Sequence, residues 1–299
     1  MSARILDGRE IARAIRGELS EEVRTLKARG VTPGLGVLLV GNNPASRSYV
    51  SAKEKACAET GILSREVHLP GDASREAILE VVDGFNRAPE INGILVQLPL
   101  PNSRIEQEVL LAIDPVKDVD GFHPVNVGRM TLGLPAYWPC TPHGILQILH
   151  RSGIPVAGKH VVILGRSNIV GRPLAILLSM KHALGNATVT ICHTASTQTA
   201  DLTRQADIVV AAAGRPHTLT AEMIKPGAVV IDVGVNRIED LTHPRGFRLV
   251  GDADYEYLLP KVSAITPVPG GVGPMTIAML LFNTVQAARR QHDLPPKDR

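Results

Sequence analysis

The sequence predicts an α/β protein built from two α/β domains, and three observations carry this prediction. Short apolar runs alternate along the chain with longer segments of helical periodicity, a pattern typical of parallel sheets covered by helices. The chain has 299 residues, of which 44% are hydrophobic and 20% charged. That length accommodates two domains of ordinary size, and that composition favours a packed core over disorder.

The first domain is predicted to cover residues 1–140. Turn residues mark its helix ends: Gly30 closes the first helix, Asn43 and Pro44 open the second, and Gly61 closes it. Strands that alternate with helices indicate a mostly parallel sheet. The helices are predicted over Arg9–Arg29, 43–61 and Ser74–Arg87, and the strands over 34–41, 65–70 and 91–101.

The second domain is predicted to cover residues 141–273. Thr141 and Pro142 open a helix, and a second alternating set of strands and helices follows. The last strong helix begins at Pro274, and the segment 274–299 is expected to return to the first domain. The strands of the second domain are predicted over 160–165, 187–193, 206–214, 227–234 and 263–266.

Charge and cysteine content argue against several classes of function. The net charge is +3 and no long run of Lys or Arg occurs, so no nucleic-acid partner is expected. No stretch approaches about 18 uninterrupted apolar residues and the N-terminus lacks a signal peptide's apolar run, so no membrane partner is expected. Cys57, Cys140 and Cys192 form no C-x-x-C pair, which predicts three reduced thiols in a cytoplasmic protein, without a structural metal or a disulfide.

The segment VVILGRSNIVG, Val161–Gly171, predicts a dinucleotide site. An apolar strand runs into Gly165 and a helix predicted from Asn168 follows, which is the context in which helix N–H groups face a pyrophosphate. The match to G-x-G-x-x-G is imperfect, because Ser167 and Val170 occupy the second and third glycine positions. A plain strand–turn–helix connection therefore stays open as the alternative at this point.

The residues around this segment favour NADP over NAD. NAD sites place Asp or Glu at the end of the second strand, where it bonds the ribose 2′-hydroxyl. Here that strand is followed by His193, Thr194 and Ser196, with no acid before Asp201. Arg166 suits a 2′-phosphate, because its planar fork matches phosphate oxygens. The plainer alternative for Arg166 is an exposed loop arginine.

A group of polar residues in the first domain predicts a reactive site. Tyr49 and Lys53 in YVSAKEK are four apart, so they share one helical face. Gln97 ends a strand beside two prolines, and the loop VKDVDGFHPVN contains Asp118 and Asp120. A lysine beside an aromatic ring is usually a surface residue, and one of the two aspartates is expected to be a turn residue. The presence of Gln97 and the two aspartates near strand ends nevertheless favours a reactive site that includes Lys53.

Two further segments follow strand ends, where ligands bind in open α/β sheets. IDVGVNR places Val235 just beyond a strand. TPVPGGVGPMT, residues 266–276, contains Gly270 and Gly271 before Pro274 starts a helix. Such a loop either brings backbone close to a ligand or is a rigid connector, and its place after the last strand favours the ligand.

Seven blocks in order make the chain resemble one family over nearly its whole length, the bifunctional methylenetetrahydrofolate dehydrogenase/methenyltetrahydrofolate cyclohydrolases. The resemblance implies two α/β domains flanking a cleft, the second a Rossmann-type NADP-binding domain. It also implies that NADP⁺ takes a hydride from 5,10-methylenetetrahydrofolate and that water then opens the methenyl cation to 10-formyltetrahydrofolate. The blocks are YVSAKEKACAETGI, GILVQLPLP, KDVDGFHPVNVGRM, PCTPHGI, VILGRSNIVGRP, DVGVNR and PVPGGVGPMT.

The resemblance implies a role for each candidate residue and a homodimer. Lys53 is the catalytic lysine, Gln97 lies beside it and helps set its state, and Tyr49 stacks on the folate. The remaining substrate-binding residues are Asp120, which bonds the pterin, and Gly270, Gly271 and Pro274 in a loop that closes over the cleft. The cofactor-binding residues are Gly165, Arg166, Ser167, Thr194 near the 2′-phosphate, and Val235 near the nicotinamide. No metal is required.

Two departures and two alternatives accompany this interpretation. Thr194 stands where the family usually has serine, which keeps the hydroxyl, and SMKHALGN, residues 179–186, is longer than the family norm. One alternative is a related two-domain dehydrogenase of an amino acid or a shikimate-like acid. The other is a non-catalytic NADPH-binding sensor. Neither has a reason to keep the reactive group in the first domain, which consists of Tyr49, Lys53, Gln97 and Asp120.

Overall fold

The computed structural model describes residues 3–240, 242–243 and 246–295, and the chain divides into two compact units. Unit 1 comprises the chain up to Ala12 together with Thr141–Thr276. Unit 2 comprises Arg13–Cys140 and the chain from Ile277 onward. The N-terminal residues thus differ from the sequence-based assignment to the first domain. The reason is that strand β1 (Arg4–Ile5) adds to the sheet of unit 1.

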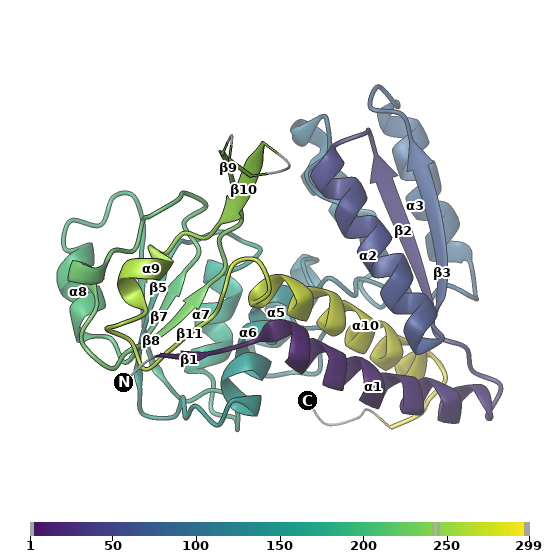
Figure 1. Ribbon diagram of the computed structural model, residues 1–299. Helices are drawn as coiled ribbons and strands as arrows, with labels where there is room; N and C mark the ends of the chain where they lie inside the picture. Colours follow the sequence, from purple (N-terminus) through teal and green to yellow (C-terminus); the bar gives the residue numbers. More distant parts are fainter. Residues whose placement is uncertain (1–2, 241, 244–245, 296–299) are drawn as a thin grey trace. The chain divides into compact units, whose positions relative to one another are not determined.

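Unit 2 is built on a three-stranded parallel sheet. Strand β2 (Gly34–Val40) lies in the centre, between β3 (Leu63–Leu69) and β4 (Gly93–Val96). Figure 1 shows helices α2 (Pro44–Thr60) and α3 (Arg75–Arg87) on either side of these strands. A strand with helices on both faces is buried on both sides, which explains why the predicted apolar run 34–41 carries no polar alternation.

The ends of helix α2 follow the predicted capping residues, and helix α3 has a side-chain cap at Ser74. The Asn43 side chain accepts the N–H of Ser46 at 3.3 Å, and Gly61 after helix α2 has a φ of +79°. Ser74 accepts the N–H of Ala77 at 3.1 Å and so caps α3. Local sequence therefore fixes where these helices begin and end.

The core of unit 2 lies between α3 and the sheet. Leu38 on β2 and Ile94 on β4 pack with Val82 and Phe85 of α3, and all four are buried. A Cβ on Gly36 would lie 2.9 Å from the Phe85 ring, so the strand needs glycine there to admit the aromatic side chain.

Two long helices contribute to both units. Helix α1 (Gly8–Lys27) and helix α10 (Val272–Gln291) each run across a unit boundary. Within unit 2, the Gln291 side chain donates to the Asn92 carbonyl at 2.8 Å and accepts from its amide at 3.0 Å. The C-terminal part of α10 is therefore tied to the segment that leads into β4. Unit 2 is completed by η1 (Ser103–Ile105), α4 (Glu106–Leu111) and α5 (Pro124–Thr131).

Unit 1 is built on a six-stranded parallel sheet of Rossmann type with the order β1-β11-β8-β7-β5-β6. The chain leaves β5 for β6 on one side and then returns to place β7 on the other side. Ligands bind at such a reversal of strand order, beyond the carboxyl ends of the strands. The strands are β5 (His160–Leu164), β6 (Thr188–Cys192), β7 (Ile208–Ala211), β8 (Val229–Asp232) and β11 (Ala264–Ile265).

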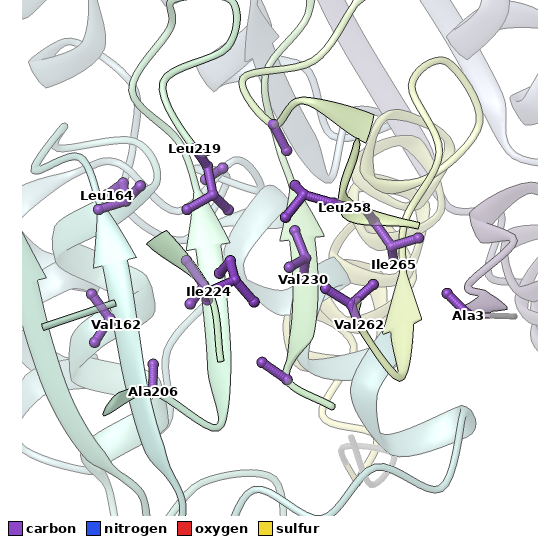
Figure 2. Close-up of a cluster of buried hydrophobic side chains, with 14 of the residues drawn as sticks. Ala3, Val162, Leu164, Ala206, Leu219, Ile224, Val230, Leu258, Val262 and Ile265 are labelled. Carbon is purple, nitrogen blue, oxygen red and sulfur yellow. The ribbon is translucent and has the colours of Figure 1, made fainter. Parts of the chain in front are cut away.

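A continuous hydrophobic cluster lies along this sheet (Figure 2). Val162 on β5, Val230 on β8 and Ile265 on β11 are fully buried, and Leu258 and Val262 pack against them. The cluster fixes the strands, so that the turns at their carboxyl ends start from a rigid base.

The elements around this sheet depart from the sequence-based expectations at two places. Helix α7 (Gly171–Ser179) begins three residues later than expected, because 168–170 form a turn. The chain after β8 forms an antiparallel hairpin, β9 (Asn236–Glu239) and β10 (Phe247–Val250), that the sequence did not predict. Helices α6 (Cys140–Arg151), α8 (Thr199–Gln205), η2 (Ala221–Met223) and α9 (Tyr255–Leu258) complete the secondary structure. Among the residues that the structure describes, no helix has the length and apolar character to cross a membrane.

Candidate active and cofactor sites

Lys53 is the candidate reactive group of unit 2. Helix α2 carries Tyr49 and Lys53 one turn apart, and the lysine is only 7% exposed. Its Nζ donates a hydrogen bond of 2.7 Å to Oε1 of Gln97. Tyr49 is 38% exposed, so its ring faces solvent and is available to a ligand. The predicted pairing of Lys53 with Gln97 is thus a direct contact.

The adjacent backbone fixes the orientation of the Gln97 side-chain amide. Its Nε2 donates to the Leu98 carbonyl at 2.7 Å, which leaves Oε1 to face Lys53. An acceptor in that position can take an N–H from either the charged or the neutral lysine. In the neutral state the lysine nitrogen keeps a lone pair that is not used by Gln97.

Burial shifts the proton affinity of the two charged groups in opposite directions. Burial lowers the pKa of Lys53, while the Asp120 carboxylate opposes this shift. Burial also raises the pKa of Asp120 to about 6, against the attraction of Lys53. The site therefore holds a lysine that loses its proton more readily than usual and a carboxyl group that ionises near neutral pH.

The two aspartates of the KDVDG loop have different surroundings. Asp118 is buried and its carboxylate accepts the N–H groups of Gly121, Phe122 and His123 and an amide N–H of Asn126, at 2.8–3.3 Å. Four donors leave this carboxylate no capacity for a ligand, so Asp118 is the residue that shapes the turn.

Asp120 stands on a loop that Asp118 and a distant helix hold in place. Gly121, next to it, has a φ of +77°, and a Cβ there would lie 2.8 Å from the Pro139 nitrogen. Asn283 of helix α10 donates to the carbonyls of Val119 and Trp138, at 2.8 and 2.9 Å. The position of the Asp120 carboxyl is therefore determined from both flanks.

Asn283 was not identified as a site residue from the sequence. It is 3% exposed and lies within the apolar stretch AMLLFNTV. The sequence does contain one indication of its role, a single amide side chain in an otherwise apolar helix. A buried polar side chain of this kind needs a hydrogen-bonding partner. The partner is a pair of loop carbonyls distant in sequence, and no local pattern reveals it.

Gly165 shapes the cofactor turn of unit 1. It follows β5 at the reversal of strand order and has a φ of +128°. A Cβ there would lie 2.1 Å from the Ala212 carbonyl oxygen after β7, so only glycine permits this approach. Gly171 at the start of α7 is equally restricted, because its Cβ would lie 2.1 Å from the Gly165 carbonyl oxygen. Gly171 thus performs the close helix–strand packing that the third glycine of G-x-G-x-x-G performs elsewhere.

The polar side chains expected at the cofactor lie on the surface of these turns. Arg166 and Ser167 are exposed after β5, and Thr194 is exposed after the neighbouring strand β6. The Ser167 hydroxyl accepts the N–H groups of Val170 and Gly171 at 3.2 and 3.4 Å, and so stabilises the turn before α7. Val235 lies between β8 and β9 and is 48% exposed.

The glycine-rich loop before α10 belongs to unit 1. The Gly270 carbonyl accepts the N–H of Arg9 at 3.1 Å, and the Gly271 N–H donates to the Pro267 carbonyl at 2.8 Å. A Cβ on Gly8 would lie 1.7 Å from the Gly271 carbonyl oxygen. Helix α10 begins at Val272, which places Pro274 in its first turn, where a missing N–H costs nothing.

Comparison with known proteins identifies the family. The tetrahydrofolate dehydrogenase/cyclohydrolase catalytic domain matches residues 6–120, and the NAD(P)-binding domain of the same family matches residues 139–292. The chain is 55% identical over 289 residues to the bifunctional protein FolD 1 of Myxococcus xanthus, covering 96% of this chain and 98% of the relative.

Solved structures agree with this assignment. The bifunctional FolD enzyme of Campylobacter jejuni is 45% identical with a TM-score of 0.90, covering 97% of this chain and 100% of that one. The Trypanosoma brucei FolD, solved with NADP cofactor and inhibitor, is 42% identical with a TM-score of 0.92, covering 98% and 99%. The expectations of two α/β domains and of a Rossmann-type NAD(P)-binding domain are confirmed. The chain belongs to the tetrahydrofolate dehydrogenase/cyclohydrolase family.

Proposed function

We propose that this enzyme oxidises 5,10-methylenetetrahydrofolate with NADP⁺ and then hydrolyses the 5,10-methenyltetrahydrofolate formed to 10-formyltetrahydrofolate. One observation carries the hydrolytic half: a buried lysine with a lowered pKa, bonded to a glutamine whose amide orientation is fixed. Family membership supports the oxidative half, because the family combines this catalytic domain with an NAD(P)-binding domain.

The residues of unit 1 fit NADP. The glycine turn after β5 brings backbone close to its neighbours, exposed Arg166 follows it, and β6 ends in His193 and Thr194 rather than in an acid. A guanidinium and a hydroxyl would hold a 2′-phosphate that a carboxylate would repel. When bound, NADP⁺ supplies the hydride acceptor. We assign its binding to Gly165, Arg166, Ser167, Thr194 and Val235.

For the hydrolytic step we assign Lys53 as general acid and base. Attack of water on the methenyl carbon forms a C–O bond and breaks the bond from that carbon to a ring nitrogen. Neutral Lys53 takes one proton from the attacking water and returns one to the leaving ring nitrogen, and the remaining hydroxyl proton is released to solvent as the formyl C=O forms. The lowered pKa of Lys53 raises the fraction of neutral amine that can do this near pH 7. Gln97 holds the amine in place while leaving its lone pair free.

We assign the other substrate contacts to Tyr49, to Asp120 and to the glycine-rich loop before α10. Tyr49 stacks on the folate, because its ring is exposed one turn from Lys53. Asp120 accepts hydrogen bonds from the pterin through its carboxylate, which is ionised above about pH 6. The loop with Gly270 and Gly271, followed by Pro274, supplies backbone contacts.

The alternative functions are less well supported. A dehydrogenase of an amino acid or a shikimate-like acid is not favoured, since the relatives at 42–55% identity over nearly the whole chain are folate enzymes. A binding-only sensor has no use for a buried lysine held by a glutamine.

We further propose a cytoplasmic homodimer. The cytoplasmic location is supported by three buried cysteines that form no disulfide. The homodimer is supported by the family resemblance, and strand β6 at the end of the sheet order in unit 1 is available for pairing. Light scattering coupled to gel filtration measures the assembly state, and a monomeric mass across micromolar concentrations would contradict the dimer.

The experiment that tests the function is a pair of lysine substitutions on one helix. Lys53→Met should lower hydrolysis of methenyltetrahydrofolate by roughly 10²- to 10⁴-fold, the usual contribution of general acid–base catalysis, and leave NADP affinity intact. Lys55→Met is the matched control, because Lys55 is exposed on the same helix. Full hydrolysis by the Lys53 variant would contradict the assignment, and absence of NADP⁺-dependent oxidation by the unmodified enzyme would contradict the proposed function itself.

A further inference from the structure

A buried carboxylate holds together the loops beyond β7 and β8. Asp252 follows β10 and is 0% exposed. Its Oδ2 accepts the N–H groups of Ala213 and Gly214 at 2.6 and 2.7 Å, and its Oδ1 accepts an amide N–H of Asn236 at 2.9 Å. One side chain therefore connects the turn after β7 to the first residue of β9.

A second buried carboxylate fixes the first. Asp232, the last residue of β8, accepts the N–H groups of Gly234 and Asp252 on Oδ1 and that of Ala253 on Oδ2, at 2.9–3.0 Å. The backbone that carries Asp252 is thereby attached to the end of a central strand. Through Gly234, the same carboxylate holds the loop that leads to Val235.

The surrounding sequence is adapted to these carboxylates. A Cβ on Gly234 would lie 2.1 Å from Oδ1 of Asp252, and a Cβ on Gly251 would lie 1.8 Å from Oδ2 of Asp232. Neither position admits another residue while the carboxylates keep their places. Burying a carboxylate is costly unless its oxygens accept hydrogen bonds, and both carboxylates here accept them from the surrounding loops.

The residue between these fixed points is Val235. It is apolar but 48% exposed, so packing does not hold it. Its two neighbours are held instead, Gly234 by Asp232 and Asn236 by Asp252. The hydrogen-bond network, and not hydrophobic contact, sets where Val235 stands at the carboxyl end of the sheet.

We propose that Asp252 is a positioning residue for the hydride-transfer step, acting through Asn236 and the turn at Ala213 to place the loop that carries Val235. This inference rests on the proposed function, since it takes Val235 as the residue that faces the nicotinamide. Hydride transfer depends on alignment of two rings, and a misplacement of about 1 Å can cost roughly 100-fold in rate. The hydrolytic residues all lie in unit 2, so hydrolysis does not depend on Asp252.

The test exchanges the partners of one hydrogen bond. In Asp252→Asn, the new amide keeps an oxygen for the two backbone N–H groups but points its nitrogen at the Asn236 amide. In the double variant Asp252→Asn/Asn236→Asp, an acceptor again faces a donor, with the direction of the bond reversed, and only the longer 3.5 Å bond from Asn236 to the Val250 carbonyl is lost. We expect the single variant to lose roughly 10- to 100-fold in the kcat of methylenetetrahydrofolate oxidation, with a smaller change in the KM for NADP⁺. We expect the double variant to recover most of that loss.

Hydrolysis of methenyltetrahydrofolate is the internal control, and it should stay unchanged in both variants. A parallel fall of both activities, or failure of the double variant to recover oxidation, would show that Asp252 is structural only and overturn the proposal. Asn236→Ala provides a second test if Asp252→Asn does not fold, because it removes a single donor. It should lower the oxidation kcat several-fold, and an unchanged kcat would overturn the proposal. An unmodified enzyme without oxidation activity would instead refute the proposed function.

Discussion

The two units differ in the solvent exposure of their proposed functional side chains. The proposed catalytic lysine of unit 2 is buried, whereas the proposed cofactor-binding side chains of unit 1 are exposed. In unit 2, Lys53 is buried, bonded to Gln97 and shifted in its proton affinity by burial. In unit 1, Arg166, Ser167 and Thr194 are exposed on turns whose backbone is fixed by glycines. A proton-transfer group needs a low-dielectric site to change its pKa, whereas a phosphate-binding group has to be reachable.

The buried aspartates show what the two units share. Asp118 in unit 2 and Asp252 in unit 1 each use their carboxylate to collect hydrogen bonds from a loop. In unit 2 that loop carries Asp120, and in unit 1 the held loops adjoin Val235. Both units therefore place a residue of the proposed function beside a carboxylate whose hydrogen bonds shape a loop. The comparison predicts that substitutions in unit 2 change rates and pH profiles, while substitutions in unit 1 change cofactor affinity or alignment.

The largest expected effect tests the buried lysine of unit 2. Gln97→Glu would place a carboxylate against Nζ of Lys53, and an opposite charge at this distance raises a lysine pKa by about 1–3 units. The neutral fraction of Lys53, and with it the rate of methenyltetrahydrofolate hydrolysis, should fall roughly 10- to 1000-fold near pH 7 and recover as pH rises. Stopped-flow absorbance measures this rate. Gln97→Ala is the uncharged control, and an unchanged pH profile in the Glu variant would contradict the role of Gln97.

The next effect tests the exposed cation of unit 1. Arg166→Ala removes a charge-assisted hydrogen bond worth about 1.5–3 kcal/mol, so the KM for NADP⁺ should rise roughly 10- to 100-fold while that for NAD⁺ changes little. Arg172→Ala is the matched control, because Arg172 is exposed nearby but donates to Asn168 at 2.7 Å. Equal losses for both cofactors in the Arg166 variant would show that it does not recognise the 2′-phosphate.

A pH titration tests the carboxyl group of unit 2. The pKa of Asp120 is raised to about 6, so the folded state binds this proton more tightly than the unfolded chain does. The contribution of Asp120 to stability therefore falls as pH rises from about 4 to 6 and is constant above. Pterin binding requires the ionised form, so the KM for the folate should rise below about pH 6, at most about tenfold per unit. Asp120→Asn should abolish this pH dependence, and a variant that keeps it would assign it to another group.

The smallest effect concerns the turn before helix α7. Ser167→Ala removes an acceptor for two N–H groups and should lower the free energy of unfolding by about 0.5–2 kcal/mol. The KM for NADP⁺ should rise only slightly, because the turn is still shaped by Gly165. Thermal denaturation measures the stability loss. A large rise in KM without any loss of stability would show that the hydroxyl serves the cofactor rather than the helix.

Local patterns were sufficient for most of the fold and for the residue types at both sites. Apolar runs bounded by glycine predicted the strands, and Asn43 and Gly61 cap and close helix α2 as expected. These features depend on residues a few positions apart, so a short window of sequence contains them. The strand–turn–helix at Gly165 and the i,i+4 pair of Tyr49 and Lys53 were found for the same reason.

Long-range contacts decided the rest. The β9–β10 hairpin is held by Asp252, and the loop of Asp120 is held by Asn283. The distinction between Asp118 and Asp120 also required the folded chain, because it depends on which carboxylate receives four donors. Burial and hydrogen-bond satisfaction are properties of the assembled unit, because they depend on how the folded chain packs around each side chain. The residue types of the proposed sites are therefore local features of the sequence, whereas their proton affinities and positions are set by packing.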